Sequence, residues 1–245
     1  MNETESGNRV ACIFGATGGI GAAMTQRLAN DPEFSIVHAG SRSGNAPSHP
    51  NVRSFQFELT SEQSIRSTAE SFKDSPPDLV VVATGVLTLE DGTGPEKSYR
   101  SLDAEAMAEV LTYNTIGPAM VAKHFLPLLP RDRRAVFAAL SARVGSISDN
   151  KLGGWHSYRA SKAALNMLIR NFAIEMGRSH KQAIIAGLHP GTVDTSLSEP
   201  FQGNVAEGKL FTPDYSAERL LNVLEGLTPS DSGGSFAWDG ERVLD

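Results

Sequence analysis

The chain has 245 residues, of which 40% are hydrophobic and 20% charged, so it is long enough to bury a sizeable core. Its 22 basic and 28 acidic residues give a formal net charge of −6, and the basic residues are scattered along the sequence. A nucleic-acid partner is therefore not expected, because nucleic acids are bound by a concentrated cationic face. Cys12 is the only cysteine, which excludes an intrachain disulfide.

The start of the sequence carries no apolar targeting segment. Residues 1–9 are polar and lack the apolar region of a signal peptide, and no run of about 18 apolar residues occurs further along. We therefore expect a cytoplasmic protein without a membrane partner, with residues 1–8 frayed.

Short β-rich runs alternate with longer helical patterns over almost the whole chain. The predicted strands are 10–14, 34–39, 52–57, 79–83, 135–140 and 183–188, with 235–238 as a further candidate. The predicted helices are 19–30, 61–73, 102–129, 155–177 and 214–226. Strands that alternate with helices favour right-handed crossovers. This order predicts a doubly wound, Rossmann-like α/β fold, with a parallel sheet of about seven strands and helices on both faces.

No linker or repeat interrupts this pattern, so residues 1–245 are predicted to form a single domain. The stretch 192–212 is long for a connection in a compact domain, and it carries the large apolar residues Leu197, Phe201 and Phe211. Loops of this length are often lids or binding segments. We predict that this stretch closes over a substrate.

A glycine-rich turn follows the first predicted strand and begins the first predicted helix. Its sequence is Gly15-Ala-Thr-Gly-Gly-Ile-Gly21. Glycines permit a close backbone approach, and free N–H groups at a helix N-terminus attract a pyrophosphate. In this context the motif predicts a dinucleotide site rather than an empty tight turn. The spacing fits both GxxxGxG and GxxGxxG, so the glycines alone do not decide the subclass.

The end of the second predicted strand indicates which nucleotide is bound. An acidic side chain there would accept hydrogen bonds from the ribose hydroxyls of NAD, whereas an arginine would pair with the 2′-phosphate of NADP. The sequence has Ser41 and Arg42 at this point, with no carboxylate beside them. We therefore predict NADP(H) in preference to NAD(H). The alternative is that Arg42 is a solvated loop residue.

Tyr158 and Lys162 lie four residues apart at the start of the helix predicted for 155–177. This spacing places both on one helix face, where the ammonium can approach the phenol or a cofactor hydroxyl. A phenol with a pKa of about 10 is a poor acid or base at neutral pH unless a cation favours the phenolate. The pair is a candidate catalytic site, although about one chain in nine of this composition has such a pair by chance.

Together these motifs resemble the short-chain dehydrogenase/reductase family, classical type. YRASK (158–162) matches the YxxxK motif, GATGGIG (15–21) the glycine loop, HPGTVDT (189–195) the turn after the sixth strand, and Asn114 the structural asparagine. The matches occur in order and cover nearly the full length. The strings SARVGSI, GGWHSYRASKAALN and LHPGTVDT make the chain most similar to C-factor/sniffer-like and carbonyl-reductase-like members.

The resemblance implies a role for each site residue. Tyr158 would exchange the proton, Lys162 would hold the nicotinamide ribose and lower the tyrosine pKa, and Asn114 would orient a water. Ser141, which ends the fifth strand, would polarise the substrate carbonyl, with Ser146 as the alternative. The residues expected to bind the cofactor are Gly15, Thr17, Gly18, Gly19, Ile20, Gly21, Ser41, Arg42, Glu58, Leu59, Ala83, Thr84, Gly85, Tyr158, Lys162, Pro190, Gly191, Val193 and Thr195.

The sequence also departs from the family pattern. The catalytic serine is usually the second of a Ser-Ser pair before xxG, but here Ala142 follows Ser141. After the fourth strand the family commonly has an asparagine-rich turn, whereas this sequence has Ala83-Thr84-Gly85. Phe14 replaces the threonine that commonly opens the glycine loop. These differences concern the substrate-polarising hydroxyl more than nucleotide binding.

Two histidines, His156 and His189, lie close to these motifs. Neither has a paired acid or the spacing of metal ligands. We expect both to be structural or to line the pocket, and we expect no metal.

The leading interpretation is an NADP(H)-dependent oxidoreductase that transfers a hydride between nicotinamide and the carbonyl or secondary alcohol of a small, largely apolar substrate. The second is a nucleotide-binding signalling or regulatory protein, similar to C-factor, with weak or incidental catalysis; the missing second serine motivates it. A third, an extended-type epimerase or dehydratase, fits the GxxGxxG spacing, but that class normally has a larger C-terminal domain than the residues after Pro190 could form. The resemblance also implies a homodimer or homotetramer.

Overall fold

The computed structural model describes residues 8–244, so the fraying expected for residues 1–8 falls almost wholly outside the described residues. The strands are β1 (Arg9–Phe14), β2 (Phe34–Ser41), β3 (Val52–Gln56), β4 (Leu79–Val82), β5 (Ala135–Leu140), β6 (Ala183–His189), β7 (Thr192–Val193), β8 (Leu210–Phe211), β9 (Ser235–Ala237) and β10 (Arg242–Val243). The α-helices are α1 (Gly19–Asn30), α2 (Glu62–Glu70), α3 (Ala104–Leu111), α4 (Gly117–Phe125), α5 (His156–Met176) and α6 (Pro213–Gly226). Shorter helical turns cover Tyr99–Ser101, Thr112–Ile116, Leu126–Leu128, Arg143–Gly145, Glu199–Asn204 and Pro229–Asp231.

Eight strands form one sheet in the order β10-β9-β6-β5-β4-β1-β2-β3, while β7 and β8 form a separate pair. Neighbouring strands of the large sheet are parallel, except that β10 runs antiparallel to β9. The doubly wound prediction is therefore confirmed, with β10 as a strand that the sequence pattern did not indicate. The strand order reverses between β1 and β4, and in such sheets ligands bind at the carboxyl ends of the strands at this point.

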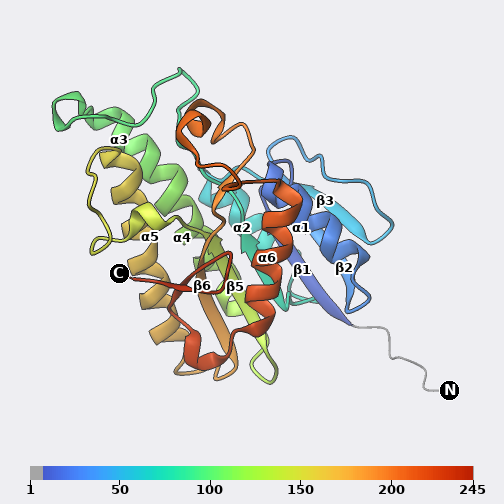
Figure 1. Ribbon diagram of the computed structural model, residues 1–245. Helices are drawn as coiled ribbons and strands as arrows, with labels where there is room; N and C mark the ends of the chain where they lie inside the picture. Colours follow the sequence, from blue (N-terminus) through green and yellow to red (C-terminus); the bar gives the residue numbers. More distant parts are fainter. Residues whose placement is uncertain (1–7, 245) are drawn as a thin grey trace.

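Helices cover both faces of the sheet (Figure 1). On one face α2, α4 and α5 pack against side chains that include Phe14 and Phe137. On the other face α1 and α6 pack against side chains that include Ile13 and Val136. Successive residues of a strand point to opposite faces, so the central strands contribute to two cores, which explains their continuously apolar sequences. None of the helices between residues 8 and 244 has the length and apolarity needed to cross a membrane.

The helix predicted for 102–129 is interrupted. Between α3 and α4 the chain forms a π-helical turn, Thr112–Ile116, and after α4 it forms a short 3₁₀ turn. A π-helical turn makes one hydrogen bond span five residues, which shifts the faces of the helix that follows. The apolar periodicity indicated the helical run but not this shift, because the pattern of apolar residues continues across it.

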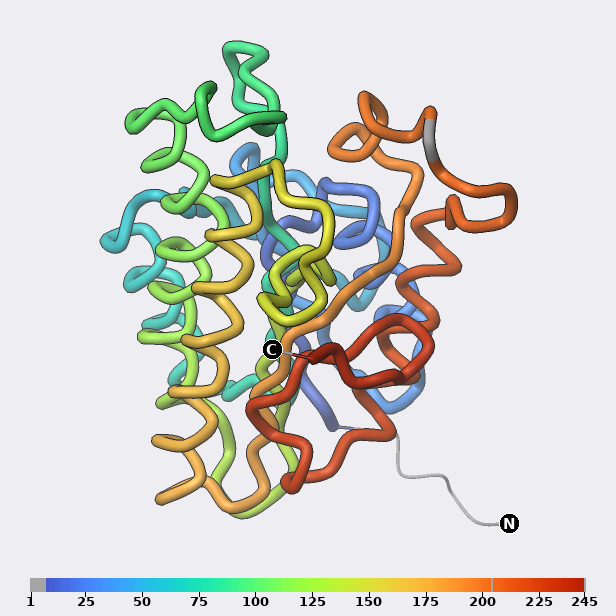
Figure 2. The backbone as a smooth tube through the Cα atoms, turned by 60° about the vertical axis from the view of Figure 1, so that its left-hand side comes forward, coloured from blue at the N-terminus to red at the C-terminus, as the bar shows by residue number. Residues whose placement is uncertain are grey.

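The stretch 192–212 is more ordered than the prediction of an irregular loop suggested. Its ends, β7 and β8, pair with each other in parallel, and a helical turn at Glu199–Asn204 lies between them. Figure 2 shows this stretch in orange and the segment 87–103 in green, both projecting beyond the same end of the sheet. After this stretch the chain forms α6 and then β9 and β10, which complete the large sheet, so the described residues contain no separate C-terminal domain of the extended type.

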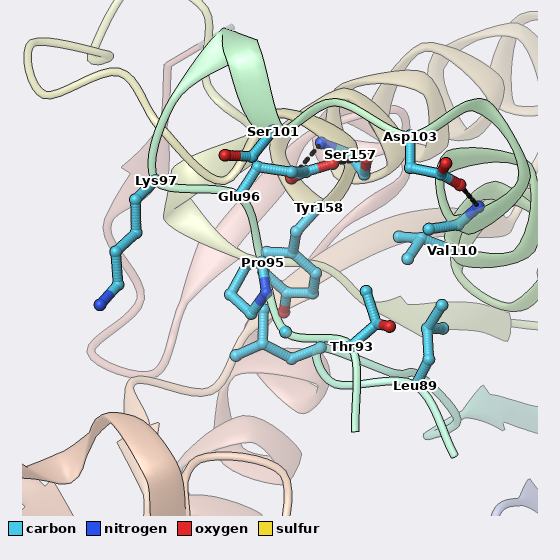
Figure 3. Close-up of a pocket in the computed structure, with 13 residues that line it drawn as sticks. Leu89, Thr93, Pro95, Glu96, Lys97, Ser101, Asp103, Val110, Ser157 and Tyr158 are labelled. Carbon is cyan, nitrogen blue, oxygen red and sulfur yellow. Dashed lines mark hydrogen bonds between the residues drawn. The ribbon is translucent and has the colours of Figure 1, made fainter. Parts of the chain in front are cut away.

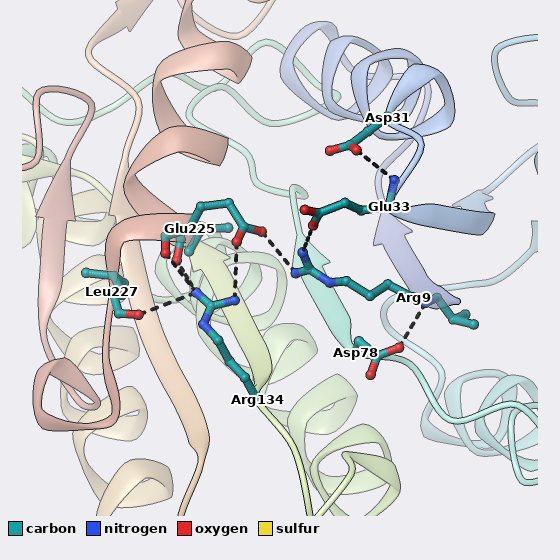
Figure 4. Close-up of polar contacts among 9 residues, drawn as sticks. Arg9, Asp31, Glu33, Asp78, Arg134, Glu225 and Leu227 are labelled. Atoms are coloured by element: carbon teal, nitrogen blue, oxygen red, sulfur yellow. Dashed lines mark hydrogen bonds and ion pairs between the residues drawn. The ribbon is translucent and has the colours of Figure 1, made fainter. Parts of the chain in front are cut away.

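Charged side chains connect several elements at the amino ends of the central strands, opposite to the end beyond which 192–212 projects (Figure 4). Glu225, near the end of α6, pairs with Arg9 of β1 at 2.9 Å and with Arg134 at 3.6 Å. Arg134 also donates a hydrogen bond to the carbonyl of Leu227 at 3.4 Å, beyond the last turn of α6. The network therefore attaches α6 to the amino ends of β1 and β5.

Asp78 anchors the start of β1 from within the protein. Its side chain is 2% exposed, accepts a hydrogen bond from the N–H of Val10 at 2.9 Å, and pairs with Arg133 at 2.6 Å. Asp78→Ala would leave a buried N–H without its acceptor, so we expect the free energy of unfolding, measured in urea, to fall by about 2–4 kcal/mol. Asp132→Ala, at an 83% exposed partner 3.7 Å from Arg133, should cost less than about 0.5 kcal/mol. Equal losses for the two variants would contradict this account.

Candidate functional site

The glycine turn lies at the carboxyl edge of the sheet, against the end of β4 and the segment after β7. Gly15 has a φ of +91°, and a Cβ there would lie 3.0 Å from the carbonyl carbon of Ala83. A Cβ on Gly19 would lie 2.6 Å from Cγ2 of Thr195. Only glycine at these two positions lets the turn approach both neighbours so closely. The structure thus brings together three stretches that the sequence assigned to the cofactor.

The start of α1 offers free hydrogen-bond donors. Its N-cap is Gly18, which has no side chain to cap the first N–H groups, and its first turn has no acidic residue. Uncapped N–H groups and the positive end of the helix dipole suit a pyrophosphate. Thr84, two residues after β4, has a buried hydroxyl that finds no hydrogen-bond partner within residues 8–244. A buried hydroxyl of this kind would be satisfied by a bound polar group, so these residues fit a dinucleotide.

The two residues expected to select the nucleotide have partners within the chain. Ser41 is 2% exposed, and its hydroxyl donates a hydrogen bond to the carbonyl of Asn45 at 2.7 Å. Arg42 forms a 2.7 Å ion pair with Glu90, and the two side chains are 67% and 77% exposed. The sequence shows no carboxylate beside Arg42, but the fold brings one from the segment after β4. Glu90 therefore binds the Arg42 guanidinium, the group that was expected to pair with a 2′-phosphate.

The other residues expected to bind the cofactor lie around the same edge. The Glu58 carboxylate accepts hydrogen bonds from the N–H and hydroxyl of Thr60, at 3.1 and 2.9 Å. Leu59 is buried, and the carbonyl of Pro190 accepts a hydrogen bond from Ser216 at 2.9 Å. The remaining residues expected to bind the cofactor lie in the glycine turn, in the first turn of α1, after β4 and around β7. They are Thr17, Ile20, Gly21, Gly85, Gly191 and Val193.

Tyr158 and Lys162 lie in the first two turns of α5, and both are buried, at 9% and 3% exposure. The ammonium of Lys162 lies 5.7 Å from the ring centroid of Tyr158 and donates a 2.8 Å hydrogen bond to the carbonyl of Leu140 at the end of β5. The four-residue spacing therefore produces the close pair that the sequence predicted. The carbonyl of Leu140, which sequence reasoning did not identify, holds the ammonium in place.

Burial shifts the protonation equilibria of this pair. It raises the pKa of Tyr158 to about 12 and lowers the pKa of Lys162 to about 8. The shift for Tyr158 is opposite to the lowering that the family resemblance implies, because burial disfavours the charged phenolate. At neutral pH the phenol is protonated and can act as a proton donor.

Asn114 fixes the segment after β4 beside this pair. It lies in the π-helical turn and is fully buried, and its side-chain amide exchanges two 2.8 Å hydrogen bonds with the backbone N–H and carbonyl of Val86. A Cβ on Gly85 would lie 3.2 Å from Oδ1 of Asn114 and 3.6 Å from Nζ of Lys162. Asn114 and Lys162 therefore lie close to the same short stretch of backbone.

The two candidate catalytic serines are both buried and have partners in the chain. The hydroxyl of Ser141 donates to Oδ1 of Asn166 in α5 at 2.7 Å. The hydroxyl of Ser146 accepts a hydrogen bond from the N–H of Asp149 at 3.1 Å. Ala142, at the position where the family has its serine, lies between β5 and the next helical turn. Each serine hydroxyl thus already helps to shape the connection from β5 to α5.

A cavity of about 410 Å³ extends to Tyr158 beneath the segment 87–103 (Figure 3). Leu87, Leu89 and Val110 are among its apolar lining residues, and Glu96 is among the polar ones. Sequence reasoning assigned the substrate to the stretch 192–212 and missed this wall. The signal that could have found it is length, since the connection between β4 and the helix predicted for 102–129 is also longer than most connections in a compact domain.

The stretch 192–212 contacts the aromatic residues beside the site. The ring of Phe201 lies 5.1 Å from that of Trp155, centroid to centroid, and Trp155 lies 6.1 Å from Tyr158. Both contacts are edge-on, the favourable arrangement for aromatic rings. The stretch 192–212 thus contacts Trp155, which in turn contacts Tyr158.

His189, the last residue of β6, is held neutral in the folded protein. Its Nδ1 is buried without a partner among the described residues, and burial lowers its pKa to about 4. His156 begins α5. Within residues 8–244 no group of three or more His, Cys, Asp or Glu side chains is placed to hold a metal ion.

The depressed pKa of His189 has a consequence for stability. An unfolded histidine binds a proton near pH 6.5, roughly, whereas the folded one does so only at about pH 4, so acidification through this window favours unfolding. We expect His189→Gln to reduce the slope of stability against pH between 4 and 6.5, measured from urea midpoints. An unchanged slope in His189→Gln would refute the assignment.

Comparisons with known proteins identify chains that are similar to this one. A family model described as short chain dehydrogenase matches residues 9–205. The 1-hydroxy-2-glutathionyl-2-methyl-3-butene dehydrogenase of Rhodococcus sp. is 34% identical over 185 residues, 75% of this chain and 76% of that protein. C-signal of Myxococcus xanthus is 32% identical over 179 residues, 73% of this chain and 99% of that protein.

Solved structures show the same fold. The NADPH-bound carbonyl reductase from chicken fatty liver has a TM-score of 0.81 and 28% identity, with 99% of this chain and 97% of that chain covered. Carbonyl reductase Sniffer of D. melanogaster has a TM-score of 0.82 and 20% identity, with 98% of this chain and 100% of that chain covered. The groups of relatives expected from the sequence strings are thus the ones found.

Proposed function

Because this chain belongs to the short-chain dehydrogenase family and is a nicotinamide-dependent oxidoreductase, we propose that it uses NADP(H) to interconvert a carbonyl and a secondary alcohol on a small, largely apolar substrate. The nicotinamide supplies or accepts the hydride. The observation that carries the proposal is the buried Tyr158–Lys162 pair, in which Tyr158 lines a cavity of about 410 Å³.

Tyr158 is the proposed proton donor to the carbonyl oxygen. Its phenol is protonated at neutral pH, and reduction needs a proton at the oxygen as the alkoxide forms. Lys162, fixed by the carbonyl of Leu140, would hold the nicotinamide ribose and stabilise the phenolate left after transfer. Ser141, or Ser146 in its place, would hydrogen-bond the carbonyl oxygen, and Asn114 would orient a water that links Lys162 to solvent.

The cavity supports the proposed substrate class. Leu87, Leu89 and Val110 give it an apolar wall suited to the body of a small hydrophobic carbonyl compound. The contact between Phe201 and Trp155 supports a lid role for the stretch 192–212, which would exclude water during the reaction.

Tyr158→Phe tests the catalytic assignment. The variant keeps the ring but lacks the hydroxyl, so we expect turnover of a panel of aldehydes, ketones and quinones to be lost, while NADPH binding stays within about two-fold of wild type. Turnover is followed by nicotinamide absorbance, and binding by the NADPH-induced shift in Tm. Wild-type turnover in the Tyr158→Phe variant would refute the role of the hydroxyl.

A second candidate function is nucleotide-dependent signalling with incidental catalysis. The similarity to C-signal supports it, as does Ala142 at the position of the family's serine. The same panel separates the two candidates. Turnover of several carbonyl compounds at enzyme-like rates favours the oxidoreductase, whereas NADPH binding without such turnover favours signalling.

The preference for NADP(H) depends on a competition at Arg42. Glu90 holds the guanidinium at 2.7 Å and would also repel a 2′-phosphate. We expect Glu90→Gln to tighten NADPH binding about five-fold at low salt, from a change of about 1 kcal/mol, and to leave NADH binding unchanged. Calorimetric titration measures both, with Glu70→Gln, at an exposed residue ending α2, as the control. Loss of NADPH affinity in Glu90→Gln would overturn this competition.

We also propose that the protein is cytoplasmic and self-associates. Met167 and Ile174 lie two turns apart on α5, and they are 61% and 51% exposed. Exposed apolar side chains on one helix face often mark an interface. This arrangement supports the homodimer or homotetramer that the family resemblance implies.

A further inference from the structure

The helix that carries Tyr158 begins without a cap of its own. Its N-cap residue, Trp155, has a left-handed backbone with a φ of +51°, and it makes no side-chain cap hydrogen bond. The first N–H groups of a helix have no partner inside the helix and need an acceptor from elsewhere. In α5 that acceptor comes from the segment after β4.

Glu96 supplies three contacts to the start of α5. Its Oε2 accepts a hydrogen bond from the N–H of Ser157 at 3.1 Å, and its Oε1 accepts one from the Ser157 hydroxyl. Its backbone carbonyl accepts a hydrogen bond from the N–H of Trp155. Figure 3 shows the carboxylate of Glu96 facing Ser157, next to Tyr158. All three contacts fall on the residues immediately before Tyr158.

A carboxylate is chemically suited to this position. A negative charge at a helix N-terminus is stabilised by the helix dipole. Burial raises the pKa of Glu96, but the hydrogen bonds from Ser157 and from the Glu96 backbone, with the charge of His156, together leave the pKa below its ordinary value. Glu96 is therefore ionised at neutral pH and keeps accepting both hydrogen bonds from Ser157.

Glu96 belongs to the wall of the cavity as well as to the cap. The segment that includes Thr93, Pro95 and Lys97 lines the same cavity as Tyr158. The contacts of Glu96 therefore fix the spacing between this wall and the first turn of α5. A change in that spacing would move the phenol relative to a substrate bound against the wall.

We propose that Glu96 is a positioning residue, whose carboxylate binds Ser157, locks the wall segment to α5, and so holds the Tyr158 hydroxyl at the substrate cavity. The proposal rests on the oxidoreductase function proposed above. It assigns to Glu96 no contact with the reacting atoms.

Kinetics of Glu96→Ala test the positioning role. A displacement of about 1 Å at a reacting group costs up to 100-fold in rate, so we expect kcat with NADPH and 4-nitrobenzaldehyde to fall 10- to 100-fold. The Kd for NADPH should stay within about two-fold, because the glycine turn is untouched. Glu96→Gln, whose amide oxygen can still accept from the Ser157 N–H, should recover part of kcat. Glu175→Gln, an exposed residue near the far end of α5, is the matched control and should resemble wild type.

Hydrogen exchange gives a readout that does not depend on turnover. In Glu96→Ala we expect faster exchange of the amides of 155–160 and 93–98 together, with the rest of the chain unchanged. Wild-type exchange in both stretches would overturn the proposal, as would a kcat within two-fold of wild type or an equal fall in kcat and NADPH affinity. Failure of the oxidoreductase function itself is distinguishable, since wild type would then show no more turnover than Tyr158→Phe while the exchange effect persisted.

Discussion

The site depends on one buried cation and the carbonyl that holds it. Lys162 is 3% exposed, and its ammonium finds its hydrogen-bond acceptor in the carbonyl of Leu140, at the end of β5. A buried ammonium without an acceptor would be costly, so this bond ties α5 to the carboxyl edge of the sheet. Gly145 lets α5 lie close to the connection from β5, since a Cβ there would lie 2.8 Å from Cβ of Lys162.

The rest of the site follows from that attachment. With α5 fixed, Tyr158 lies beside the stretch after β4, which Asn114 holds by two hydrogen bonds to Val86. The glycine turn lies against Ala83 and Thr84, at the start of the same stretch. Contacts to the backbone therefore link the glycine turn, Tyr158 and the cavity, and the parallel sheet sets their relative positions.

The sequence was informative wherever chemistry follows from local spacing. The glycine turn, the YxxxK pair and the alternation of strands and helices each predict a structure within a few residues, and the structure has them. Contacts between distant segments could not be predicted this way. The pairing of Arg42 with Glu90, the capping of α5 by Glu96 and the π-helical turn around Asn114 all depend on how separate segments pack, and no periodicity encodes them. The raised pKa of Tyr158 likewise reflects burial, which spacing does not reveal.

The ion network at the amino ends of the strands has a consequence for how this protein can change. Asp78 and Glu225 secure β1 and α6 at the pole opposite to the glycine turn and Tyr158. Substitutions in the segments beyond the carboxyl edge thus leave these anchors intact. Their effects on the free energy of unfolding are expected to be independent of the anchors, because the two regions are distant. Because the Asp78 and Glu225 contacts lie away from the carboxyl edge, the binding specificity of that edge can change while these contacts persist.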